Sequence, residues 1–276
     1  MKMRGTEFDD RVRRFHELHE QGCFVIPNPW DRGSARVLAS LGFKALATTS
    51  AGFAWSMGRP DKHVDVEVVL KHLRGMCRVV DVPVSADFEG GFGIAPEAIA
   101  RHVTDAIATG IAVLSIEDSS DDPVAPLYDF PLAVERIKAA RLAIDESGTG
   151  VLLTARTEGF IVGRPDLRET VRRLTAFAEA GADCLYAPGL RALTDIKAVV
   201  AAVAPKPVNV LVASDFTTLH ELAQAGVRRI SVGGALARTA WTGFLQAARE
   251  IAEHGTFTAL ARSIAGADIN RVLGDS

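Results

Sequence analysis

The feature that most constrains the fold is a regular alternation of short apolar runs with longer amphipathic runs along the chain. The short runs are rich in Val, Ile, Leu and Ala without polar alternation, which is typical of strands buried on both faces of a parallel sheet. The longer runs have the periodicity of amphipathic helices. The predicted strands are Phe24–Pro27, Ala45–Thr49, Val84–Asp87, Val113–Glu117, Val151–Arg156, Cys184–Ala187, Val208–Val212 and Arg229–Val232. The predicted helices are Arg32–Leu41, Val66–Val80, Pro96–Thr109, Leu132–Glu146, Leu167–Ala180, Ala192–Val203, Phe216–Ala225 and Leu236–His254.

Glycine marks four of the joints between a predicted helix and the next strand. These glycines are Gly42, Gly110, Gly181 and Gly226, and the left-handed conformation that ends a helix suits glycine. Eight such pairs without a linker predict an α/β fold, a (β/α)8 TIM-type barrel that forms a single domain over residues 1–276. A doubly wound open sheet is the alternative.

The chain has a further helix-like stretch, Phe257–Ala265, beyond the eight-unit pattern. We therefore predict that residues 254–276 form a C-terminal extension that contains an additional helix. This helix is expected either to cap the barrel or to pack on a neighbouring subunit.

Composition narrows the function classes. Lys and Arg number 31 against 34 Asp and Glu, giving a net charge of −3, which argues against a nucleic-acid or membrane partner. The cysteines Cys23, Cys77 and Cys184 have no metal or disulfide spacing. No run approaches the roughly 18 apolar residues of a membrane span, and the first ten residues are polar rather than signal-like. These features predict a cytoplasmic protein.

Acidic residues collect at the carboxyl ends of neighbouring predicted strands, where barrel active sites lie. Asp87 and Glu89 follow the third strand and Glu117 ends the fourth. Carboxylates that face one another repel unless a cation joins them, and Mg²⁺ prefers oxygen ligands. We therefore predict a Mg²⁺ site, with Mn²⁺ as a possible substitute. The alternative is that these acids cap the helices that follow.

Arg156 is the only Lys or Arg predicted at a strand end in this mouth, and its planar fork suits a carboxylate. It is expected to bind a substrate carboxylate, or else to neutralise its acidic neighbours. Ser50-Ala51-Gly52 is predicted as a small-residue turn whose N–H groups could face an anion. No His or Lys ends a predicted strand, which disfavours a His-ligated zinc site, a serine triad or a Schiff-base aldolase.

Four segments in order resemble the isocitrate lyase/phosphoenolpyruvate mutase superfamily over roughly residues 15–253. Residues 85–93, Ser-Ala-Asp-Phe-Glu-Gly-Gly-Phe-Gly, are similar to its metal loop. Residues 116–118 (Ile-Glu-Asp) and 155–160 (Ala-Arg-Thr-Glu-Gly-Phe) match later strand ends, and residues 50–52 with 58–61 (Gly-Arg-Pro-Asp) match its oxyanion turn and second-strand aspartate.

The resemblance implies a Mg²⁺-dependent enzyme that acts on small anionic 2-oxo or 2-hydroxy acids through an enolate-like intermediate. It also implies a homo-oligomer, a dimer or tetramer, often with the terminal helix exchanged. Asp87 would bind Mg²⁺ most directly, with Glu89, Glu117 and Asp61 around its waters. The implied metal set is Asp87, Glu89 and Glu117, the catalytic set is Arg156, Glu117 and Asp61, and the substrate-binding set is Ser50, Ala51, Gly52, Arg156 and Asn209.

The loop after the fourth strand departs from the superfamily. Residues 118–128 contain no Cys, Lys or His, so neither the lyase cysteine nor the mutase Lys and Asn are present. We therefore predict a lyase or decarboxylase that cleaves a C–C bond. The alternatives are P–C chemistry, as in a phosphonopyruvate hydrolase or a carboxyphosphonoenolpyruvate or phosphoenolpyruvate mutase, and a non-catalytic barrel that binds 2-oxo acids. The Ser, Asp and Pro content of Asp118–Asp129 predicts a mobile lid.

Overall fold

The computed structural model describes residues 6–274. Its eight strands form a nearly closed parallel barrel in the order β1-β8-β7-β6-β5-β4-β3-β2. Where β1 and β2 meet, the Ala47 N–H donates to the Pro27 carbonyl at 3.0 Å. The predicted (β/α)8 barrel is confirmed and the open sheet is wrong. The strands are β1 (Phe24–Ile26), β2 (Leu46–Ala47), β3 (Val84–Asp87), β4 (Val113–Glu117), β5 (Leu152–Arg156), β6 (Cys184–Tyr186), β7 (Val208–Leu211) and β8 (Arg229–Ser231).

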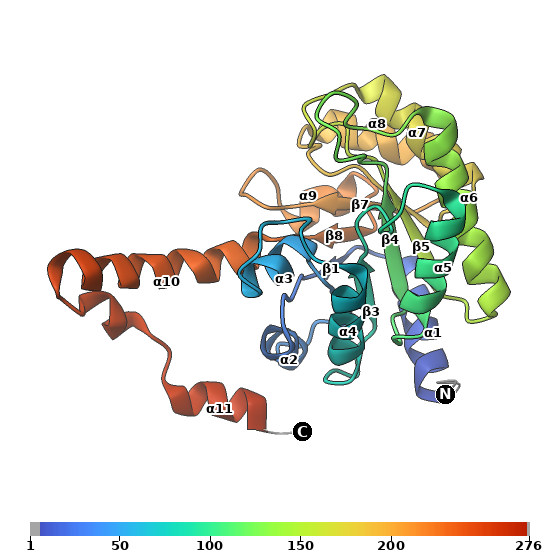
Figure 1. The fold of residues 1–276 in the computed structure, drawn as a ribbon. Coiled ribbons are helices and arrows are strands. Elements are labelled where there is room, and N and C mark those ends of the chain that lie inside the picture. The colour runs from blue at the N-terminus through green and yellow to red at the C-terminus, as the bar shows by residue number, and fades with distance from the viewer. Residues whose placement is uncertain (1–5, 275–276) are drawn as a thin grey trace.

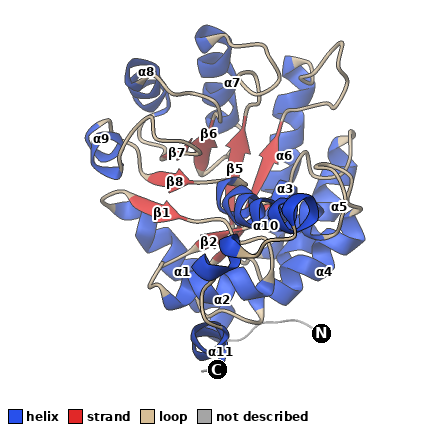
Figure 2. Cartoon of the chain, turned by 90° about the vertical axis from the view of Figure 1, so that its left-hand side faces the viewer, coloured by secondary structure: helices blue, strands red, loops and turns tan. Residues whose placement is uncertain are grey.

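Helices surround the strands as an outer layer (Figures 1 and 2). The predicted Phe216–Ala225 helix begins later, because Thr218 caps it and exchanges hydrogen bonds with Glu221. The helices that follow the strands are α2 (Arg32–Ser40), α4 (Val66–Cys77), α5 (Pro96–Ile107), α6 (Phe130–Ser147), α7 (Leu167–Glu179), α8 (Leu193–Val203), α9 (Leu219–Gln224) and α10 (Ala235–His254).

The structure contains two helices in the first 60 residues that the sequence did not predict. The first, α1 (Thr6–Glu20), buries Phe8, Val12 and Phe15 along one face. Its Arg11 Nη1 donates to the Cys77 carbonyl at 2.7 Å, so α1 lies at the end of the barrel away from the carboxyl ends of the strands.

The second is α3 (Ser50–Ser56), which replaces the predicted Ser50–Gly52 turn. The hydroxyl of Thr49 caps it by accepting from the Gly52 N–H at 3.3 Å. A Cβ at Gly52 would lie 2.9 Å from Cβ of Trp30, so glycine is required where this helix begins.

The predicted additional C-terminal helix is confirmed, but its position at Phe257–Ala265 is wrong. A 3₁₀ helix covers Thr258–Arg262, Ser263 takes an extended conformation, and a separate α11 (Gly266–Gly274) follows. Residues 275–276 of this extension, like residues 1–5, lie outside the described range. Figure 1 shows α10 projecting away from the barrel. No helix among residues 6–274 is long and apolar enough to cross a membrane.

The apolar core lies between the strands and the surrounding helices, where Phe88, Phe177 and Leu114 are fully buried. Inside the barrel, toward the carboxyl ends of the strands, the side chains are smaller and more polar, as at Ser115 and Thr154. Small side chains leave space there, and this space becomes the candidate site.

Candidate active site

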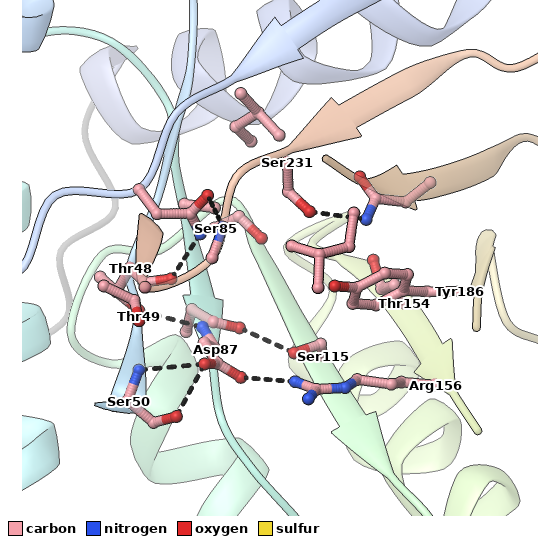
Figure 3. A pocket seen from close by; sticks show the side chains of 18 of the residues that line it. Thr48, Thr49, Ser50, Ser85, Asp87, Ser115, Thr154, Arg156, Tyr186 and Ser231 are labelled. Carbon is pink, nitrogen blue, oxygen red and sulfur yellow. Dashed lines mark hydrogen bonds and ion pairs between the residues drawn. The ribbon is translucent and has the colours of Figure 1, made fainter. Parts of the chain in front are cut away.

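A cavity of about 160 Å³ opens at the carboxyl ends of the strands. It is far larger than the roughly 10–15 Å³ that one water requires. Figure 3 shows Ser50 and Asp87 on one side, with Thr154, Tyr186 and Ser231 across the space. All eight strands contribute, through Ile26, Ala47, Ser85, Asp87, Ser115, Thr154, Arg156, Tyr186, Asn209, Leu211, Arg229 and Ser231. Among the predicted site residues, Ser50, Ala51, Asp61, Asp87, Arg156 and Asn209 line it.

Asp87 is held by donors from two directions. Its Oδ2 accepts from the backbone N–H of Ser50 at 3.0 Å and from the Ser50 hydroxyl at 2.8 Å. Its Oδ1 lies 3.2 Å from Nη1 of Arg156 (Figure 3). The start of α3 therefore fixes the carboxylate at the end of β3, a contact that neither segment reveals alone.

Arg156 joins three carboxylates at the end of β5. Its Nη1 lies 3.2 Å from both Asp87 Oδ1 and Glu117 Oε2, and its Nε donates to Glu158. Its guanidinium also lies over the Tyr186 ring, 5.3 Å from the ring centre. The neutralising role is thus present in the structure, while the predicted role as a substrate ligand stays a prediction.

A further cation, Lys62, reaches the mouth from a loop, where a prediction limited to strand ends did not look. Lys62 follows Asp61 in the loop before α4, and its Nζ lies 3.2 Å from Glu117 Oε1. The prediction missed Lys62 because it lies in a loop rather than at a strand end. Glu117 is only 3% exposed, and burial raises its pKa to about 7 although Arg156 and Lys62 lower it.

Glu89 and Asp61 bring further negative charge to Asp87. Burial, and after it the charges of Asp87, Glu117 and Asp61, together raise the pKa of Glu89 to about 8. Glu89 and Asp87 share a second, smaller pocket beneath α3. Loss of water and the Asp87 charge also raise the pKa of Asp61. The predicted acids are therefore brought together around Asp87.

The donor set fits a divalent cation that keeps most of its waters. No three His, Cys, Asp or Glu side chains among residues 6–274 are grouped closely enough to hold one ion together. The excess negative charge around Glu89 nevertheless favours a cation, and Mg²⁺ commonly takes one or two carboxylates with several waters. Asp87 and Glu89 suit it best, since both line one pocket, whereas Glu117 lines neither pocket and both of its oxygens face cations.

A polar cluster on the opposite side of the cavity was largely missed. Asn209 donates to the Ser231 hydroxyl at 2.9 Å and accepts from Arg229 Nε at 3.0 Å. Tyr186 lies beside Ser231, and burial raises the pKa of its phenol to about 12. Arg229 was visible as a lone charge in a predicted apolar strand, which is the signal that could have found this cluster.

The segment predicted to be a lid, Asp118–Asp129, is partly buried against the rest of the barrel. Asp118 and Ser119 are buried, which corrects the expectation that none of this loop packs. Thr157 and Arg173 donate to Asp118 at 2.7 and 3.1 Å. The segment from Asp121 to Ala125 is exposed, and its mobility stays a prediction.

Comparisons with known proteins find relatives in sequence and in fold. The sequence model of the family "Phosphoenolpyruvate phosphomutase" matches residues 15–252. A Burkholderia cenocepacia J2315 protein, provisionally called a lyase/mutase, is 45% identical, with a TM-score of 0.95 over 98% of each chain. The oxaloacetate decarboxylase of Paraburkholderia xenovorans is 30% identical over 79% of this chain and 73% of its own. An oxaloacetate acetylhydrolase solved with its product oxalate is 25% identical, with a TM-score of 0.85 over 96% of this chain and 94% of its own.

Proposed function

Because this chain belongs to the phosphoenolpyruvate phosphomutase family, we propose that it is a Mg²⁺-dependent enzyme that cleaves a C–C bond in a small 2-oxo or 2-hydroxy carboxylic acid. The observation that carries the proposal is the cation-bridged acidic mouth. Arg156 bridges Asp87 and Glu117 beside a cavity of about 160 Å³. A cavity of this size suits a small acid rather than a large cofactor.

The residues of this chain have distinct roles in the proposal. Ser50 orients Asp87 through two hydrogen bonds, so that one carboxylate is presented in a fixed position. Arg156 keeps the acidic mouth compatible with an anionic substrate, since it offsets the charges of its neighbours. The predicted substrate ligands Ser50, Ala51 and Asn209 line the same cavity.

Mg²⁺ would be held by Asp87 directly and by Glu89 and Asp61 through water. When bound, it would act as a Lewis acid on the substrate oxygen on which negative charge develops. Mn²⁺ has similar ligand preferences and would substitute.

The named relatives support a small oxo acid as the substrate class. The decarboxylase and the acetylhydrolase described above both carry oxaloacetate in their names. The loop at residues 118–128 contains no Cys, Lys or His, so release of glyoxylate from isocitrate is not expected.

Turnover of a substrate panel tests the proposal. The panel contains oxaloacetate, phosphonopyruvate and 2-methylisocitrate, each assayed with Mg²⁺ and with a chelator. The expected result is Mg²⁺-dependent C–C cleavage of one acid at about 1–1000 s⁻¹. Cleavage of phosphonopyruvate alone would establish the P–C alternative. Binding without turnover of any acid would indicate the non-catalytic barrel.

The partner proposed for the α10 arm is a second copy of this chain. Trp241, Phe244 and Leu245 are 38%, 60% and 41% exposed on a helix that extends away from the barrel (Figure 1). Large apolar side chains grouped on a projecting helix favour burial against another surface. A dimer or tetramer with exchanged arms would bury them.

A further inference from the structure

Arg136 on α6 is a buried cation that binds main chain instead of an acid. It is the largest fully buried side chain in residues 6–274, with 1% of the residue exposed. Its Nη2 donates to the Gly90 carbonyl, and its Nη1 donates to the carbonyls of Gly93 and Ile94, the latter at 2.9 Å. No carboxylate in the described range pairs with it, and its Nε is buried without a partner. Three acceptors in one short loop indicate that Arg136 holds that loop.

The loop that Arg136 contacts, residues 88–94, has a strained backbone. It joins β3 to α5, which lies beside α6 (Figure 1). Glu89 and Phe92 have φ angles of 48° and 59°, a left-handed conformation that residues other than glycine seldom adopt. Such a conformation persists only where the surroundings determine it. The strain matters because it directs the Glu89 side chain, which lines a pocket together with Asp87.

Other donors hold the first half of the loop. The Glu117 N–H donates to the Glu89 carbonyl at 3.0 Å, and His102 Nδ1 donates to the Gly91 carbonyl at 2.9 Å. Arg136 adds the Gly90 carbonyl and both carbonyls of the second half, so its planar fork spans the strained segment. A Cβ at Gly90 would lie 3.2 Å from Arg136 Nη2, so glycine permits this close approach.

The Tyr128 ring covers the guanidinium of Arg136, whose Cζ lies 4.1 Å from the ring centre. An aromatic face attracts a cation, so the ring offsets part of the cost of burying a charge without an acid. The ring is itself fixed, because the Tyr128 N–H donates to the Asp118 carbonyl at 2.9 Å and Arg173 Nη1 donates to the Tyr128 carbonyl at 3.0 Å. Arg136 therefore lies between an anchored ring and the strained loop.

We infer that Arg136, with Tyr128 behind it, is a positioning residue that fixes the strained loop and so holds Glu89 beside Asp87. The inference rests on the proposed function for the role of Glu89, which is to hold the waters of a divalent cation. Arg136 lines neither the main cavity nor the pocket beneath α3, so it acts through Glu89. Groups that orient the ligands of a metal commonly change its affinity by about 10- to 100-fold.

Mn²⁺ binding, measured by electron paramagnetic resonance of the free ion, tests the inference in Arg136→Lys. Lysine keeps the charge, but its single nitrogen cannot reach the carbonyls on both sides of the loop. The affinity for Mn²⁺ should fall about 10-fold. The matched control is Arg141→Lys on the same helix, which loses a fork between Asp145 and Asp183 instead. The control should bind Mn²⁺ as wild type does.

Amide hydrogen exchange of residues 88–94, measured without metal, tests the hold on the loop itself. Exchange should become several-fold faster in Arg136→Lys and stay unchanged in Arg141→Lys, because only the first variant releases the loop. Equal exchange in wild type and both variants would overturn the inference. So would an Mn²⁺ affinity that falls equally in both variants, because the loss would then reflect general destabilisation.

Tyr128→Leu keeps the inference testable if Arg136→Lys does not fold. It removes the ring behind the guanidinium, and its control Tyr128→Phe keeps the ring. Exchange in residues 88–94 should rise in the leucine variant alone, and equal exchange in the two variants would overturn the inference.

The two measurements separate this inference from the proposed function. A wild type that binds no Mn²⁺, with faster loop exchange in Arg136→Lys, would overturn the proposed metal site and support the hold on the loop. A wild type that binds Mn²⁺, with unchanged affinity and exchange in Arg136→Lys, would overturn this inference alone.

Discussion

The Nζ of Lys62 lies 3.2 Å from Oε1 of Glu117, and this ion pair joins the loop before α4 to the end of β4. The same ammonium donates to the Ser119 hydroxyl at 2.8 Å and pairs with Asp121. Although burial lowers it, these acids raise the pKa of Lys62 above its usual range, so it stays charged. Lys62 therefore connects the buried acid to the exposed loop beside it.

Replacing Lys62 should loosen that loop. In Lys62→Met the contacts with Ser119 and Asp121 are lost, so cleavage by an Asp-specific protease at Asp121 or Asp122 should become several-fold faster. The control is Lys138→Met, because Lys138 makes an exposed pair with Glu135 on α6. Equal cleavage rates in wild type and Lys62→Met would show that Lys62 does not restrain the loop.

Arg156→Lys should lower both stability and substrate affinity. A lysine offers one point charge and cannot reach all three carboxylates, and Glu117 and Glu158 are 3% and 2% exposed. An unmatched buried charge of this kind costs about 1.5–3 kcal/mol, so Tm should fall by several degrees. Arg271→Lys, which alters an exposed pair with Asp268, is the control for calorimetric melting.

A normal Tm in Arg156→Lys would contradict the balancing role that the contacts give this residue. Substrate affinity measured in the same variant tests the second role. A decrease of about 10- to 150-fold is expected for a lost charge-assisted bond. Unchanged affinity would mean that Arg156 only balances its acidic neighbours.

Acid should destabilise the protein through His19 on α1. Burial and then the Arg229 charge lower its pKa from 6.5 to about 3, and its Nε2 is buried without a partner. Between these values the unfolded chain binds a proton that the folded chain does not. Stability is therefore complete above pH 6.5 and falls by about 1.4 kcal/mol per pH unit below it, for this one group.

His19→Phe should reduce that slope, with each variant compared with itself at pH 7 and pH 5 by urea denaturation. A smaller dependence of the unfolding free energy on pH should remain in the variant, because burial also lowers the pKa of His72, to about 4. His254→Gln changes an exposed histidine and is the control. An unchanged slope in His19→Phe would show that His19 is not the group that titrates.

The α10 arm should determine the oligomeric state. Light scattering with size-exclusion chromatography is expected to give a dimer or tetramer for wild type. Phe244→Glu places a charge on the most exposed aromatic of the arm and should shift the protein toward monomer. Val124→Glu, on the exposed loop, is the control. A monomeric wild type would contradict the proposed second copy.

The barrel could be predicted because its evidence is local. Apolar runs such as Val113–Glu117 are short and flanked by helices, and glycines such as Gly110 lie at the joints. The α1 helix was missed because its buried residues Phe8, Val12 and Phe15 are spaced among many charges. The Ser50–Ser56 helix was missed because its small residues show no amphipathic pattern.

From the sequence, only those site residues that lie at the carboxyl ends of predicted strands could be identified. Asp87, Glu117 and Arg156 belong to this class, and the structure brings them within ion-pair distance through Arg156. Lys62 comes from a loop, and its partner Glu117 is 55 positions away along the chain, so no local pattern joins them. Arg229 begins β8 and extends across the barrel to Thr154, which depends on register between distant strands.

Calorimetry with oxalate in wild type and Asp87→Asn shows whether Asp87 is part of a Mg²⁺-dependent site for acids. The asparagine keeps the volume and one acceptor for Ser50, whereas Asp87→Ala would leave the donors of Ser50 and Arg156 unpaired. We expect wild type to bind oxalate with Mg²⁺ but not with a chelator, and the variant, although folded, to bind it under neither condition. Equal oxalate binding by wild type with and without Mg²⁺, or by Asp87→Asn with Mg²⁺, would contradict this expectation.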